Sequence, residues 1–246
     1  MALLLGPYRV RRGMRREELS NVHDVHQADS SQHPLGLQEV VQVQLRLGRT
    51  DYDAMYRCPE GADEAAWQLE HMRQFSLELN QLTVALDEVC SKLTCPVMKA
   101  TDEWLFLCAA HKKPQECSAI DYIIHTLDGT AALLNSNKWF PSRVTIPASS
   151  LTYYKSIARR LYRVFSHAFF HHREAFDIFE NETHLCKRFV VFSQIFELIP
   201  EKLLMIPFEE LGMGFERQLN IARIKDDKKR KQTQKGNTNT VKYEKK

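Results

Sequence analysis

The chain has 246 residues, of which 43% are hydrophobic and 26% are charged, a composition typical of a globular protein. Only nine residues are glycine, so glycine-rich phosphate-binding loops and turn-dense sheets are disfavoured and helices are favoured. Residues 225–246 contain nine Lys or Arg and three Asp or Glu, which leaves the rest of the chain with a net charge of −3 and argues against nucleic acid as the partner of the folded body.

The sequence contains no recognisable secretory or membrane-spanning segment. The apolar run near the N-terminus is shorter than the roughly seven residues that a secretory signal requires, and no stretch approaches the roughly 20 apolar residues of a membrane span. We therefore expect a cytoplasmic protein, at most peripheral to internal membranes, with nuclear access through the basic run Lys228–Lys231. In that compartment its six cysteines are expected to be thiols or metal ligands rather than disulfides.

The first ordered elements are predicted to be helical. Residues 1–34 are polar and uneven in composition, and we expect them to be disordered. A short amphipathic helix is predicted over residues 35–47. From Asp63 to about Val89, apolar residues recur at spacings of three to five, which predicts a long helix. Residues 104–107 have strand character but can form no more than a minor hairpin.

Serine residues mark the predicted starts of the next two helices. Ser118 is expected to cap a helix that ends at Leu134. Ser149 and Ser150 are expected to cap the longest helix, which would run to about Phe179 and span roughly 45 Å.

The C-terminal part is predicted to contain one more helix and a tail. The helix would follow Asn181 and end at Pro200. Residues 213–246 are expected to be a disordered basic tail. The sequence thus predicts an all-α fold, a helix bundle with a four-helix core plus short helices and a possible minor β-hairpin, in one domain over residues 35–212.

Two groups of residues have the chemistry of a metal site. Cys90 and Cys95 form a Cys-x4-Cys pair at the end of one predicted helix, and His167, His171 and His172 lie within another. Thiolate and imidazole ligands suit Zn²⁺, and two of each complete its tetrahedron. The alternative is that these cysteines are small buried hydrophobes and the histidines are ordinary core or surface residues.

A row of arginines precedes the histidines. Arg159, Arg160 and Arg163 are spaced so that their guanidinium groups can converge on one point, and Lys155 extends the row. Because Arg binds phosphate with two parallel hydrogen bonds, this face is a candidate phosphoserine or phosphothreonine site. The alternative is a solvated charged face of an amphipathic helix.

No catalytic residue is assigned. Cys108 and His111 have the spacing of a nucleophile and a base, but no orienting carboxylate or oxyanion hole is evident nearby. We interpret Cys58, Cys108, Cys117 and Cys186 as scattered buried thiols.

Three segments resemble the Mob/phocein family: PEGADEAAWQLEHMRQFSLELNQL, FLCAAHKKPQECSAIDYIIHTLDGTAALLNSNKWFPSRV and RRLYRVFSHAFFHHREAFDIFENETHLCKRF. The similarity extends over about residues 35–207 and is strongest to the phocein branch. It implies a helical fold with one structural Zn²⁺, held by Cys90, Cys95, His167 and His172. An undistorted helix would instead place His171 on the side of His167, so His171 stays the alternative fourth ligand.

The resemblance also implies docking surfaces. A basic trio at the positions of Arg159, Arg160 and Arg163 receives a phosphothreonine peptide in kinase-activating relatives. An acidic face corresponding to Asp63, Glu64 and Glu70 binds the basic N-terminal extension of kinases of the NDR type. A solvated helix start is the alternative explanation of these carboxylates.

The function implied is that of a non-catalytic adaptor. Its partners would be a protein kinase of the germinal-centre or NDR class, a striatin-type scaffold and the serine/threonine phosphatase bound to that scaffold. The first alternative is a direct allosteric co-activator of an NDR- or LATS-type kinase. Two others are a zinc hydrolase and a protein that binds nucleic acid through its basic tail.

Overall fold

The computed structural model describes residues 52–214, and within them the chain is helical without a β-sheet, as predicted. Its contacts divide this part into two compact units, residues 52–186 and 187–214. The helices are α3 (Tyr52–Tyr56), α4 (Glu64–Asp87), α5 (Ala119–Leu134), α6 (Leu151–His171), α7 (Arg173–Thr183) and α8 (Leu185–Ile195), with short 3₁₀ turns at Ala148–Ser150, Glu201–Leu203 and Glu209–Leu211.

Several predictions lie outside the described residues. These are the disordered segment 1–34, the helix over residues 35–47 and nearly all of the basic tail over residues 213–246. The domain bounds at 35 and 212 stay predictions.

The long helix predicted from residue 63 is α4. Asp63 is its N-cap, and the carboxylate accepts a hydrogen bond of 2.8 Å from the backbone N–H of Ala66. The apolar positions at helical spacing are buried, Trp67 completely, and its indole N–H donates to the carbonyl of Tyr56 at 3.1 Å. Burial of this stripe explains why a polar-rich segment folds as one helix of 24 residues.

Helix α5 begins and ends at the predicted residues. Ser118 is its N-cap, and the hydroxyl accepts a hydrogen bond from the backbone N–H of Asp121 at 3.3 Å while donating to the Asp121 carboxylate at 2.7 Å. The cap satisfies a backbone donor that has no partner inside the helix.

We expect Ser118→Ala to lower the free energy of unfolding by about 1 kcal/mol and the melting temperature by about 2–4 °C. Thermal unfolding measures the change. Ser149→Ala is the matched control, because Ser149 is exposed and caps no helix. Equal losses for the two variants would contradict the capping role.

The helix predicted from residue 150 to about 179 is two helices, and this prediction was wrong. α6 ends at His171, and α7 begins at Arg173. His172 between them has φ −137° and ψ 51°, outside the helical region. Within residues 52–214 the longest helix is therefore α4, and the 21 residues of α6 span only about 32 Å. Ser150 also forms no side-chain cap, because its hydroxyl donates to the carbonyl of Trp139 instead.

The last predicted helix also begins and ends at residues other than those predicted. Asn181 lies inside α7, which is followed by His184 in a left-handed conformation with φ 51°. α8 then begins at Leu185 and ends at Ile195, well before Pro200. The minor hairpin predicted at residues 104–107 is reduced to two isolated antiparallel bridges, Lys99 with Leu105 and Cys108 with Gln115.

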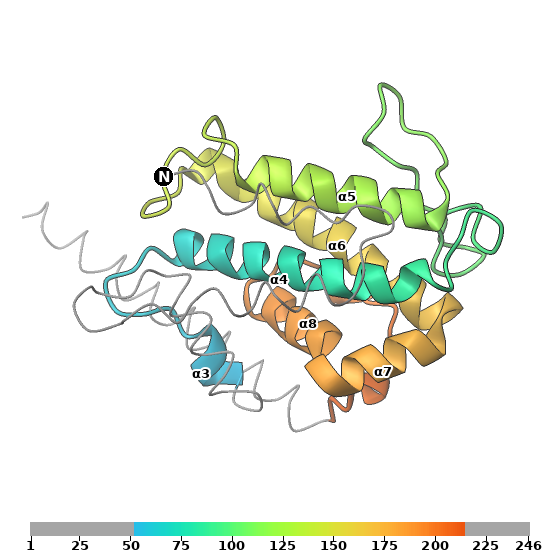
Figure 1. Cartoon of the computed structure of the whole chain (residues 1–246). Helices are drawn as coiled ribbons and strands as arrows, with labels where there is room; N and C mark the ends of the chain where they lie inside the picture. Colours follow the sequence, from blue (N-terminus) through green and yellow to red (C-terminus); the bar gives the residue numbers. More distant parts are fainter. Residues whose placement is uncertain (1–51, 215–246) are drawn as a thin grey trace, which may run out of the picture. The chain divides into compact units, whose positions relative to one another are not determined.

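Four helices of the first unit enclose its core. α4 packs against α5, α6 and α7, while α6 also packs against α5 and α7 (Figure 1). Large side chains such as Trp67, Phe75, Tyr122 and Phe165 are fully buried between them. None of the helices in the described part combines the length and the apolar character needed to cross a membrane.

Candidate metal centre and basic surface

The two cysteines lie on a tight turn that directly follows α4. The backbone N–H of Cys90 donates to Leu86 at 2.7 Å, and that of Cys95 donates to Ser91 at 2.8 Å. Ser91 and Thr94 close the turn through hydrogen bonds between each side chain and the backbone N–H of the other. Both thiols consequently lie inside the protein, with Cys90 only 1% and Cys95 8% exposed.

The two histidines come from the end of α6. His167 is completely buried, and its Nε2 lies 3.5 Å from Sγ of Cys90. His172 is half-buried, and its Nε2 lies 3.3 Å from Sγ of Cys95. All four donor atoms lie within 4.8 Å of one another, so two Cys–His pairs, each separated by 77 positions, form one group that could hold a metal ion.

A hydrogen bond fixes the His167 ring in the tautomer that can bind a metal ion through Nε2. Its Nδ1 lies 2.7 Å from the carbonyl oxygen of Lys99, which can only accept, so Nδ1 carries the proton. Nε2 then keeps its lone pair and points at the thiols. Burial is also the main cause that lowers the pKa of His167 to about 4, so the ring is neutral at pH 7.

The break after α6 explains which histidine joins the cysteines. On a continuous helix His172 would be directed well away from His167. Because the helix ends at His171, the non-helical backbone of His172 directs its ring to Cys95, with its Nε2 3.3 Å from Sγ of Cys95. The His171 ring stacks on that of His167, with the centroids 4.8 Å apart. His171 is exposed and is not in the group.

The donor set fits Zn²⁺. Bond lengths of about 2.3 Å to sulfur and 2.0–2.1 Å to nitrogen place neighbouring S and N ligands about 3.6 Å apart in a tetrahedral site. The separations of 3.5 and 3.3 Å match this value. Without a cation, burial and then the neighbouring Cys95 raise the pKa of Cys90 to about 12, so a bound divalent ion would supply the charge that the thiolates need.

The predicted phosphate-binding arginines all lie on α6 but differ in burial and in their contacts. Arg159 and Arg160 are exposed, whereas Arg163 is half-buried. The Arg163 guanidinium donates to the hydroxyl of Tyr122 at 2.7 Å and lies over the ring of Phe106, 4.7 Å from its centroid. Within residues 52–214, none of the three arginines forms an ion pair with a carboxylate.

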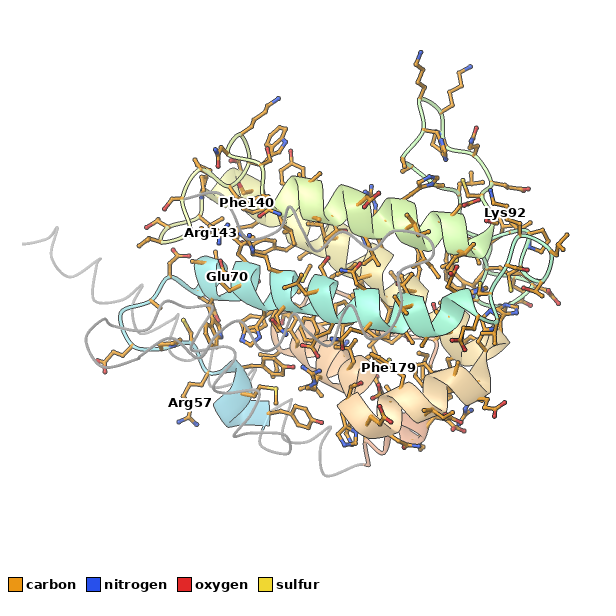
Figure 2. All side chains as sticks on the ribbon, in the orientation of Figure 1. Arg57, Glu70, Lys92, Phe140, Arg143 and Phe179 are labelled. Carbon is orange, nitrogen blue, oxygen red and sulfur yellow. The ribbon has the colours of Figure 1, made fainter. Side chains whose placement is uncertain are left out.

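The three predicted partner-binding carboxylates do not form one exposed face. Asp63 and Glu64 are partly exposed at the start of α4, but the Asp63 carboxylate is engaged as the helix cap. Glu70 is only 5% exposed and lies 3.9 Å from Arg73. Figure 2 shows Glu70 and Arg143 at the same end of the first unit. Glu70 is thus the least exposed of the three carboxylates, and their docking role stays a prediction.

Sequence reasoning missed a second group. Cys108 and Cys117 were interpreted as scattered thiols, and His125 was not singled out. The structure places both cysteines together with His111 and His125, their donor atoms within 4.8 Å of one another. The spacing Cys-x2-His-x5-Cys-x7-His was the available signal, although it matches no compact zinc finger.

The fold and this site define a helical protein whose Cys/His group joins the end of one long helix to the end of another. A model of the Mob1/phocein family matches residues 44–207. The chain is 52% identical over 173 residues to MOB kinase activator-like 4 of Drosophila melanogaster, covering 70% of this chain and 78% of the fly protein. It is 51% identical over 173 residues to MOB-like protein phocein of Caenorhabditis elegans, with the same coverage of 70% and 78%. The chain therefore belongs to the Mob1/phocein family, and the resemblance seen in its sequence is confirmed.

Proposed function

We propose that this chain is a non-catalytic adaptor that links a protein kinase to a striatin-type scaffold and, through the scaffold, to a serine/threonine phosphatase. One structural Zn²⁺ at Cys90, Cys95, His167 and His172 holds the bundle that displays its docking surfaces. Recognition of a phosphorylated segment makes assembly conditional on phosphorylation.

The observation that carries the proposal is the basic surface on α6, formed by Arg159, Arg160 and Arg163. A guanidinium that is not neutralised by a carboxylate is free to bind phosphate with two parallel hydrogen bonds. Arg163 is held in place by Tyr122 and Phe106, so it loses little conformational freedom on binding. Arg159 and Arg160 lie four and three residues before Arg163, about one turn away on the same helix.

The donor set of the metal centre supports a structural role. Four protein ligands complete the tetrahedron of Zn²⁺ and leave no position for a water molecule or a substrate. A hydrolytic zinc enzyme needs such an open position. The zinc-hydrolase alternative is therefore disfavoured, and the alternative of nucleic-acid binding depends on a tail outside the described residues.

The kinase and scaffold partners rest on family membership. The name phocein, carried by the relative in C. elegans, supports the scaffold assignment, which follows from the resemblance to the phocein branch. The name of the fly relative, a kinase activator-like protein, favours a second candidate, a direct co-activator of an NDR- or LATS-type kinase.

The phosphate requirement is tested with paired peptides from the partner kinase or scaffold, identical except for one phosphate on threonine. We expect the phosphorylated peptide to bind at least about tenfold more tightly, because one or more charge-assisted hydrogen bonds contribute about 1.5–3 kcal/mol each. Fluorescence anisotropy with the full chain measures both affinities. Equal binding would overturn phosphate recognition.

A second experiment separates the adaptor from the direct co-activator. The full chain is immobilised and offered the isolated kinase or the isolated scaffold. An adaptor retains the isolated scaffold even when no kinase is present, and it leaves the turnover of the kinase in solution unchanged. Retention of the kinase alone, with a higher kcat, would favour the co-activator.

A further inference from the structure

The second group of metal-type ligands lies around the loop that leads into α5. Cys108 and His111 belong to the loop itself, Cys117 directly precedes the capping residue of α5, and His125 is on the second turn of that helix. In Figure 1 this green segment projects beyond the helices before it enters α5. It lies outside the centre formed by Cys90 and Cys95.

Backbone hydrogen bonds bring the loop cysteines together before any metal is considered. Cys108 and Gln115 exchange two hydrogen bonds of 2.7 and 3.2 Å, which closes the loop as a small antiparallel bridge. The carbonyl of Cys117 accepts a third bond, of 3.0 Å, from the backbone N–H of Met98. The two thiols are thus placed on neighbouring segments, and both lie next to α5.

The side chains then converge in the geometry of a tetrahedral site. Sγ of Cys108 lies 3.5 Å from Nδ1 of His125, and Sγ of Cys117 lies 3.0 Å from Nε2 of His111. Cys117 is also 3.9 Å from Nδ1 of His125. These separations bracket the value of about 3.6 Å expected between S and N ligands of Zn²⁺.

We propose that Cys108, His111, Cys117 and His125 bind a second structural Zn²⁺. Two thiolates and two imidazoles are the ligand chemistry that Zn²⁺ prefers, and the ion fastens the loop to the N-terminal half of α5. Each chain then carries two zinc ions rather than one.

Metal binding explains the convergence of these four side chains better than burial of apolar surface does. Residues 109, 110 and 112–116 are all exposed, so the loop buries almost no apolar surface that could hold it in place. His111, Cys117 and His125 are only half-buried, unlike cysteines and histidines that fill a core. A catalytic pair would use one thiol and one imidazole, whereas here a second of each lies within 4.8 Å.

The second zinc also has a structural consequence for the basic surface. Phe106, over which the Arg163 guanidinium lies, is two residues before Cys108. Its backbone N–H donates to Met98 at 2.8 Å, next to the bond that joins Met98 to Cys117. Fastening the loop therefore also fixes the ring that positions Arg163.

The proposal is tested by counting zinc in the full chain, purified without chelators under reducing conditions. Elemental analysis and native mass spectrometry should give two zinc ions per wild-type chain, one for His111→Ala and one for Cys117→Ser. Cys58→Ser is the control and should keep two, because Cys58 belongs to neither group. His111 is on an exposed loop, so its replacement is not expected to unfold the helices.

Further variants separate the two sites. His172→Ala should leave one zinc, and His172→Ala combined with His111→Ala should leave none. Loss of one ion with His172→Ala but no loss with His111→Ala would overturn the second site while the first stands. One zinc in the wild-type chain, or a disulfide between Cys108 and Cys117 in the reduced preparation, would also overturn it. Cobalt substitution gives an independent readout, because thiolate-to-cobalt absorption should fall by about half in His111→Ala.

Discussion

Replacing His172 with alanine is expected to lower the melting temperature by about 10–20 °C. The variant leaves the proposed zinc site with three ligands, so the zinc that we propose to join the end of α4 to the end of α6 is lost or weakened. A structural zinc contributes folding free energy directly, and a loss of about 5 kcal/mol in a protein of this size corresponds to this change in temperature. Thermal unfolding with parallel zinc analysis measures both effects.

His171→Ala is the matched control for this prediction. His171 is the adjacent residue and has the same side chain, but it is exposed and lies outside the group of donor atoms. We expect its replacement to change the melting temperature by no more than about 2 °C, the usual range for a surface position. Addition of a strong chelator should bring the wild-type protein down to the melting temperature of His172→Ala or below it. Equal effects of the two alanine variants would exclude His172 as the ligand.

Replacing both Arg159 and Arg160 with alanine is expected to weaken binding of the phosphorylated peptide by about 100-fold. Each arginine contributes a charge-assisted interaction with the phosphate of about 1.5 kcal/mol or more, and each 1.4 kcal/mol is a factor of ten. Both side chains are exposed and unpaired with any carboxylate in the described part of the chain, so the fold should be unaffected. Anisotropy titration of the peptide measures the loss.

Two further variants make this prediction specific. Arg143→Ala removes an exposed arginine from the loop between α5 and α6 and should leave the affinity unchanged. Tyr122→Phe removes only the hydroxyl to which Arg163 donates and should cost about fivefold, the effect of one ordinary hydrogen bond. If the double variant weakened the phosphorylated and unphosphorylated peptides equally, the arginines would be a general basic surface rather than a phosphate site.

Local signals explain why α4 and α5 were predictable. The caps at Asp63 and Ser118 act within three residues along the chain, and the apolar stripe that follows each has helical spacing. The pairing of Cys90 and Cys95 with histidines about 70 residues away was suggested by ligand chemistry and by the family resemblance. None of these signals depends on how the helices pack.

The errors arose where packing overrides a local pattern. The apolar and aromatic positions between residues 150 and 179 continue at helical spacing across His172, so they gave no sign of a break. Glu70 is part of a polar-rich helix start, and its burial beside Arg73 is not apparent from that local pattern. The second Cys/His group joins a loop to a helix, and its spacing is not that of a known compact motif.

The sequence by itself determined the helical class, the Ser118 cap of α5, the family and the residue types of one candidate metal site. Tertiary structure places His172, the histidine that the family resemblance implied, beside Cys95, and it alone revealed that His125 lies beside Cys108. The physical reason is that periodicity and capping are set by neighbours along the chain. The convergence of ligands depends on backbone angles at a helix break and on loop closure, which are set by contacts distant in sequence.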